Sequence, residues 1–174
     1  MSKAIMISIE RCLGCKSCEL ACAVAHSQSK VLEDAIKESP GPQKRVTVES
    51  AGEFGVPMQC RHCEDAPCIS ICPTLAIQRY EAGGPVLIEN QRCIGCKYCL
   101  MVCPFGVIDV TTDGRAVIKC DLCVERMRSG QEPACVEACP TKALKLMDMK
   151  DVGADRRRRI ALELFVLNQK SNKE

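Results

Sequence analysis

The stretch CIGCKYCLMVCP, residues 93–104, spaces four cysteines as C-x2-C-x2-C-x3-C and adds a proline after the last one. The stretch CLGCKSCELAC, residues 12–22, has the same spacing without the proline. Two further groups of four follow the same theme, one compact at residues 60–73 and one spread over residues 120–123 and 135–140. The chain is therefore an internal repeat of four cysteine blocks, which we number one to four in chain order, and this repeat dictates its architecture.

The composition restricts what these thiols can do. Sixteen of the 174 residues are Cys, about 9%, a density that in a short secreted chain would indicate a disulfide scaffold. The opening MSKAIMISIE has one Lys and no apolar stretch as long as a signal peptide needs, so we expect a cytoplasmic protein whose thiols stay reduced. A net charge of +2 gives no indication of a nucleic-acid or membrane partner. No apolar run approaches the ~18 residues of a membrane span.

Iron is the metal that this cysteine pattern favours. The spacing of blocks one and three is that of the bacterial 4Fe–4S run, in which three cysteines wrap one cube and the fourth binds a neighbouring cube. Zinc sites use two C-x2-C pairs and have no place for a third close cysteine. The sequence therefore predicts four 4Fe–4S clusters, about 16 iron atoms, held by blocks that work in pairs. The spacing leaves the pairing open: one with four and two with three, or one with two and three with four.

Beyond the cysteines themselves, the blocks resemble those of a known family, the four-cluster iron–sulfur subunits of the dimethyl sulfoxide reductase type. The short members of that family serve carbon monoxide dehydrogenase, formate dehydrogenase, hydrogenase and tungsten aldehyde oxidoreductase complexes. The resemblance covers residues 3–147 and rests on CLGCKSCELACAVAHS, QCRHCEDAPCISICPTLAI, CIGCKYCLMVCPFGVI and KCDLCVER…PACVEACPTKAL. It implies an α+β fold of two fused ferredoxin-like halves within residues 1–147, with blocks one and four in one half and blocks two and three in the other. Residues 148–174 would form a C-terminal helix for subunit or oligomer contact.

The resemblance also implies which cysteines bind each cluster. The four ligand sets, which we call sets one to four, are Cys12, Cys15, Cys18 and Cys139; Cys22, Cys120, Cys123 and Cys135; Cys60, Cys63, Cys68 and Cys103; and Cys72, Cys93, Cys96 and Cys99. Some family members carry Trp at the second cysteine of block three and hold a 3Fe–4S cluster. Here that position is Cys96, so all four clusters should be complete 4Fe–4S cubes. Block one has Ala23 where the other blocks have proline, which changes a turn and not a ligand.

Short strands should enter and leave the cysteine loops. Runs rich in apolar and β-branched residues flank the blocks, at residues 4–9, 73–80, 85–88, 104–111, 116–118 and 140–147. A short helix is expected from the third cysteine of a block, as in residues 18–28, and another at residues 31–38 before the loop SPGPQK. Good helix formers dominate the tail, which carries a short apolar run at residues 160–167.

These features favour an electron carrier over an enzyme. The sequence offers no nucleophile–base set, phosphate loop or dinucleotide fingerprint, so no catalytic residue is predicted. We expect single electrons to pass through four clusters between a catalytic oxidoreductase subunit, of the aldehyde-, formate- or CO-oxidising type or a hydrogenase, and its redox partner. The alternative is a free polyferredoxin that shuttles electrons between separate enzymes. Free carriers are commonly acidic, whereas this chain is near neutral with a basic, apolar tail.

Several residues near the blocks have two interpretations. His26 and His62 could tune a cluster or pass a proton, although a packing role is the more common one. Lys16, Lys97 and Lys119 lie next to ligands and could raise a potential, dock a partner or merely be solvated. The run Arg156–Arg159 could dock an acidic subunit or be solvated. The apolar run behind it could pack on the chain itself or mediate self-association through the C-terminal helix.

Overall fold

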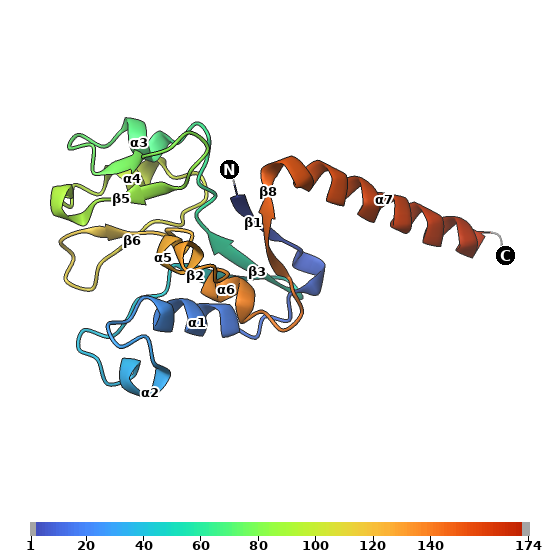
Figure 1. Ribbon diagram of the computed structural model, residues 1–174, viewed down its shortest axis with the longest axis horizontal. Coiled ribbons are helices and arrows are strands. Elements are labelled where there is room, and N and C mark those ends of the chain that lie inside the picture. The colour runs from blue at the N-terminus through green and yellow to red at the C-terminus, as the bar shows by residue number, and fades with distance from the viewer. Residues whose placement is uncertain (1–2, 172–174) are drawn as a thin grey trace.

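The computed structural model describes the backbone of residues 3–171 and the side chains of residues 3–165 (Figure 1). Each cysteine block lies between two short strands, and a short helix follows its first cysteines. The strands are β1 (Lys3–Ile7), β2 (Val46–Ala51), β3 (Phe54–Gln59), β4 (Ile77–Arg79), β5 (Val86–Ile88), β6 (Asp109–Val110), β7 (Val117–Ile118) and β8 (Leu144–Asp148). The helices are α1 (Ser17–Ala25), α2 (Leu32–Ala35), α3 (Pro67–Ser70), α4 (Tyr98–Val102), α5 (Val124–Arg128), α6 (Ala134–Glu137) and α7 (Met149–Ser171).

The eight strands form four antiparallel pairs. Three pairs are hairpins between successive blocks, namely β2–β3, β4–β5 and β6–β7. The fourth joins the first strand of the chain to the last, with Lys3 opposite Asp148 and Ile7 opposite Leu144. The strands predicted on either side of the blocks are confirmed, whereas the hairpin β2–β3 had no predicted position. The helix predicted at residues 31–38 is a single turn, α2.

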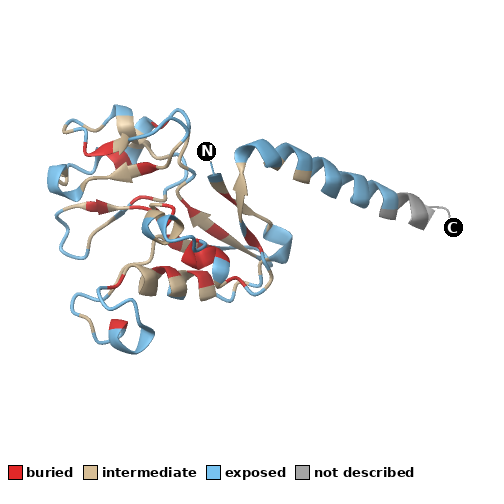
Figure 2. Cartoon of the chain, in the orientation of Figure 1, coloured by how far each residue is buried: buried red, intermediate tan, exposed pale blue. Residues whose placement is uncertain are grey.

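Two separate hydrophobic clusters lie beneath the loops. The first is built from residues of blocks one and four with β2: Ile5, Cys18, Cys22, Val46, Val48, Leu122, Cys135, Val136, Cys139, Ala143 and Leu144. The second is built around blocks two and three: Ala66, Ile77, Val86, Cys99, Ile108 and Val117. Both clusters are small and rich in cysteine, so the hydrophobic core cannot be separated from the thiols. Figure 2 shows these buried residues in the body of the molecule.

Leu144 tests how much the first cluster contributes to stability, because its side chain is 0% exposed. We expect Leu144→Ala to lower the free energy of unfolding by about 2–5 kcal/mol through lost burial and an unfilled cavity. Leu162→Ala on α7 is the matched control: Leu162 is 60% exposed, and surface changes stay within about 0.5 kcal/mol. Anaerobic urea unfolding followed by circular dichroism measures both. Equal losses in the two variants would contradict the assignment of the core.

The predicted C-terminal helix is present as α7, which leaves the body beside β8 and extends away from it (Figure 1). Its basic run is not wholly solvated, because Arg159 donates to Ser8 Oγ at 3.1 Å and to Glu10 Oε1 at 2.5 Å. The helix is largely exposed in Figure 2, with Leu164 61% and Phe165 60% exposed. Residues 172–174 of the predicted helix lie outside the described residues. Over the described part of the chain, we find no helix with both the length and the apolarity needed to cross a membrane.

Candidate functional site

The internal repeat of the sequence is also a repeat of backbone conformation. In every block the residue two places after the first cysteine has positive φ: Gly14, His62, Gly95 and Leu122. The lysine after the second cysteine is also left-handed in blocks one and three, at Lys16 and Lys97. In blocks two, three and four the residue three places after the last cysteine has positive φ as well: Leu75, Gly106 and Lys142. The four loops are therefore variants of one backbone pattern.

Set two is the most buried of the four sets. Cys22, Cys120, Cys123 and Cys135 are all buried. Burial raises the pKa of Cys135, and the neighbouring Cys120, Cys22 and Cys123 raise it further. Burial likewise raises the pKa of Cys123 to about 11. Four buried thiols that disfavour one another's ionisation need a positive centre between them to be stable as thiolates, and this donor set fits a cluster iron.

The thiols of set three line one cavity. Cys60, Cys63, Cys68 and Cys103 surround it, together with apolar groups that include Phe105. Burial raises the pKa of Cys68, Lys119 lowers it, and Cys60 and Cys103 raise it. These four residues come from blocks two and three, so the fold has brought together cysteines up to 43 positions apart.

The two remaining sets lie nearer to the surface. In set one, a hydrogen bond with Ser17 lowers the pKa of Cys15, and nearby Cys139 opposes that shift. In set four, burial raises the pKa of Cys99 to about 11, with contributions from Cys93 and Cys96. Cys72 packs partly buried against the same hydrophobic cluster as Cys99. Cys15 and Cys96 are the two exposed cysteines of the sixteen.

A thiol of one set also shifts the pKa of a thiol in a neighbouring set. Cys18 of set one raises the pKa of Cys135 in set two, after burial and closer thiols. Cys60 of set three raises the pKa of the buried Cys120 in set two. Cys68 of set three raises the pKa of Cys99 in set four. Set one thus lies near set two, set two near set three, and set three near set four.

Several donors are directed at the cysteine sulfurs. Four backbone N–H groups donate to them: Arg45 to Cys22 at 3.2 Å, His62 to Cys60 at 3.4 Å, Leu122 to Cys120 at 3.4 Å and Ala143 to Cys139 at 3.2 Å. In blocks two and four the threonine after Cys-Pro has its hydroxyl 3.8 Å from the sulfur, at Thr74 and Thr141. Such bonds favour the thiolate and tune the potential of a bound cluster.

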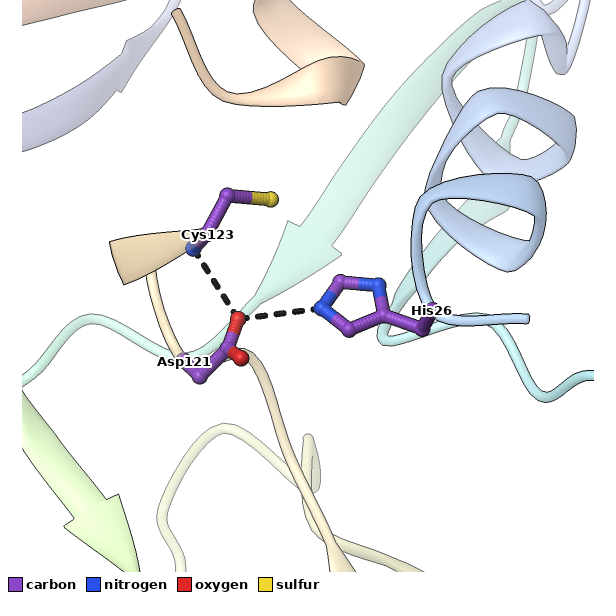
Figure 3. Close-up of side chains that lie close together, drawn as sticks. All are labelled: His26, Asp121 and Cys123. Carbon is purple, nitrogen blue, oxygen red and sulfur yellow. Dashed lines mark hydrogen bonds and ion pairs between the residues drawn. The ribbon is translucent and has the colours of Figure 1, made fainter. Parts of the chain in front are cut away.

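A polar network beside set two fixes its loops (Figure 3). Asp121 Oδ1 accepts from His26 Nε2 at 3.1 Å and from the N–H of Cys123 at 2.9 Å, and Oδ2 pairs with Arg45 at 2.7 Å. Against the effect of burial, His26 and Arg45 hold the pKa of Asp121 well below its usual range. Also against burial, Asp121 and Cys22 raise the pKa of His26 to about 9. His26, Asp121 and Cys123 are close enough to suggest a metal site, but Asp121 already accepts from three donors, so the group positions the loops.

Exposure and contacts distinguish the lysines and histidines for which the sequence allowed two interpretations. Lys16 and Lys97 are exposed, whereas Lys119 is buried. His26 belongs to the network of Asp121, and His62 lies half-buried in the loop of block two. Burial, with the nearby charge of Lys119, lowers the pKa of His62 to about 3. Sequence reasoning identified both histidines but missed Asp121 and Arg45, since their partners lie far away along the chain.

Comparisons with known proteins agree on the kind of site. Residues 53–149 match the model of the 4Fe–4S dicluster domain, and residues 9–25 match that of a 4Fe–4S binding domain. An iron–sulfur protein of Rhodospirillum rubrum is 49% identical over 80% of this chain and 79% of its own length. The electron transport protein HydN of Escherichia coli K12 is 36% identical over 93% of this chain and 99% of its own. The thiosulfate reductase electron transfer subunit PhsB of Salmonella typhi is 39% identical over 78% of this chain and 70% of its own.

Proposed function

Because the chain belongs to the family of ferredoxin-type 4Fe–4S electron-transport subunits, we propose that it is a four-cluster member of the dimethyl sulfoxide reductase type. It carries single electrons between the catalytic subunit of an oxidoreductase and that enzyme's redox partner, and it is not itself catalytic. Its body, residues 1–147, consists of two fused ferredoxin-like halves. The separate hydrophobic clusters around blocks one and four and around blocks two and three support this division.

The proposed ligands are sets one to four. Support for joining block four to block one comes from Cys135, whose pKa responds to Cys120, Cys123 and Cys22. Support for joining block two to block three comes from the cavity that Cys60, Cys63, Cys68 and Cys103 line together. Bound clusters would supply one-electron oxidation and reduction. The chain's own part is to hold the thiolates, direct N–H groups at them and bury set two.

The observation that carries the proposal is the linear order of the sets, with exposed ends. Set two is buried, while sets one and four each keep an exposed cysteine, Cys15 and Cys96. Apolar side chains surround those two ends, with Leu13 73%, Ile94 67% and Met101 83% exposed. A series of sites with one buried set and an exposed cysteine at each end suits a conductor between two proteins, since exposed apolar patches mark contact surfaces.

The catalytic partner is proposed by type. Candidates are tungsten or molybdenum enzymes that oxidise aldehydes or formate, carbon monoxide dehydrogenase, and hydrogenase, in the cytoplasm. The name of PhsB, an electron transfer subunit of thiosulfate reductase, supports a place within a complex over a freely diffusing polyferredoxin. Residues 148–174 are proposed as the contact for a partner or a second copy, because α7 presents Leu162, Leu164 and Phe165 to solvent.

The first test is metal analysis of the complex purified without oxygen through a tag on this chain. We expect about 16 iron atoms per chain, together with the metal of the partner. Tungsten or molybdenum would indicate an aldehyde or formate enzyme, and nickel would indicate carbon monoxide dehydrogenase or a nickel hydrogenase. Iron with no other protein would indicate the free carrier, and zinc in place of iron would overturn the proposal.

Paired cysteine variants test the ligand sets. If Cys22 and Cys120 bind the same cluster, the double variant Cys22→Ala/Cys120→Ala loses one cluster and keeps about 12 iron atoms. The matched variant Cys22→Ala/Cys60→Ala then loses two clusters and keeps about 8. Pairing of block one with block two would exchange these two results. Iron and sulfide assays on anaerobically reconstituted protein distinguish them.

A further inference from the structure

Lys119 is a buried cation without a carboxylate partner. Its side chain is 4% exposed, and its ammonium donates to two backbone carbonyls, those of Val86 and, at 3.0 Å, Cys120. None of the ion pairs among the described side chains includes it. Burying a charge without a counter-charge is costly, so an ammonium in this position needs a negative group nearby.

His62 presents a second polar group at the same place. Its Nδ1 lies 3.1 Å from the backbone nitrogen of Val86 and 3.2 Å from the carbonyl oxygen, so the ring contacts Val86 in either tautomer. Nε2 is buried and has no hydrogen-bond partner among the described residues. Val86 therefore contacts both groups, the imidazole of His62 and, through its carbonyl, the ammonium of Lys119. Unsatisfied buried polar atoms are rare and require an explanation.

Both groups lie where set three meets set two. His62 is in the loop between Cys60 and Cys63, and Lys119 directly precedes Cys120. Val86, whose carbonyl accepts from the Lys119 ammonium, lines the same cavity as the four thiols of set three. A positive group beside a cluster favours added negative charge at that centre.

We propose that Lys119 is a fixed positive charge that raises the reduction potential of the cluster held by set three. The inference rests on the proposed four-cluster function. Reduction adds one electron, and the buried ammonium stabilises the added charge with little screening by salt. This one-electron reduction requires no proton and no co-reactant.

The loops of blocks two and four differ in the charge of the residue that follows the first cysteine. After its first cysteine, block two has Arg61, and block four has Asp121 at the equivalent position. Arg61 is exposed and lies over the ring of Phe105 at 5.8 Å, so solvent screens it and its contribution is the smaller one. The residue that follows the first cysteine is thus positive in block two and negative in block four.

Redox titration followed by electron paramagnetic resonance, on anaerobically reconstituted protein, tests the role of Lys119. In Lys119→Met we expect one cluster to show about a tenfold weaker reduction equilibrium, ~59 mV for a one-electron couple. Lys119→Arg should keep the wild-type value because it keeps the charge. Lys97→Met is the matched control, since Lys97 also lies beside a ligand but is exposed, and it should move no potential by more than about a third of that amount.

Each result has one meaning. Unchanged potentials in Lys119→Met, at wild-type iron content, would overturn the role of Lys119 and leave the four-cluster proposal intact. Fewer than four clusters in the wild-type protein would instead overturn the proposed function. Lys119→Gln is the second neutral variant, since its amide can still donate a hydrogen bond. Loss of iron in both neutral variants would assign Lys119 to folding and would also overturn the inference.

Discussion

Removal of iron by a chelator under anaerobic conditions is expected to unfold the body of the protein, residues 3–148. Four of the eleven residues in the first hydrophobic cluster are cysteines, and the second cluster has only six members. Cores this small rarely sustain a fold without metal. Structural metal sites supply ~10 kcal/mol or more of apparent folding energy, which is as large as the stability of a typical domain, ~5–15 kcal/mol.

Hydrogen exchange locates this effect. In the iron-loaded protein the amides of β1 and β8 should be protected because these strands pair along their whole length. After chelation, protection should fall to the level of an unfolded chain, and iron with sulfide should restore it. Mock treatment with a chelator already saturated with iron is the control. Protected β1 and β8 amides in iron-free protein would refute the view that the thiols and the core form one unit.

A methyl group added at Gly95 should remove one cluster. Gly95 has φ +67°, and a Cβ there would overlap the carbonyl oxygen of Arg115 and lie 3.1 Å from its carbonyl carbon. Both atoms belong to backbone, so the loop that presents Cys93 and Cys96 has to move. We expect Gly95→Ala to reconstitute with about 12 iron atoms in place of 16, read by iron and sulfide assay.

Gly14 provides the matched control for that variant. It occupies the equivalent place in block one with φ +65°, but a Cβ there meets nothing within 4 Å. Gly14→Ala therefore carries only the left-handed strain, about 1–2 kcal/mol, and should keep about 16 iron atoms. Equal iron loss in both variants would show that backbone strain alone disrupts the loops and that the contact with Arg115 is irrelevant.

Local sequence signals were sufficient for much of the fold. β-branched runs beside the blocks predicted strands such as β1 and β8, and helix formers in the tail predicted α7. The hairpin β2–β3 also had a signal, the alternation of buried Val46 and Val48 with less buried residues, but its strands include Ser50 and Pro57, which are uncommon in strands.

Distant contacts could not be predicted in the same way. Asp121 lies 95 positions from His26, and no local pattern marks an aspartate that accepts from three donors. Lys119 and Lys97 look alike in sequence, each beside a cysteine ligand. Only the packing of Val86, 33 positions away, distinguishes the buried lysine from the exposed one. The cysteine spacing is a local signal for which residues would bind metal, while the surroundings that would tune each site depend on tertiary structure.

The pairing of β1 with β8 also determines the order in which parts of the chain can fold during synthesis. A ribosome releases blocks two and three as one continuous segment, so their thiols can meet as soon as residues 60–103 have emerged. Block one emerges earlier, but its strand β1 can pair only after residues 144–148 have been synthesised. Until then block one has neither its strand partner nor the thiols of block four beside it. Blocks two and three would therefore fold first. Blocks one and four would fold later, once β8 has left the ribosome.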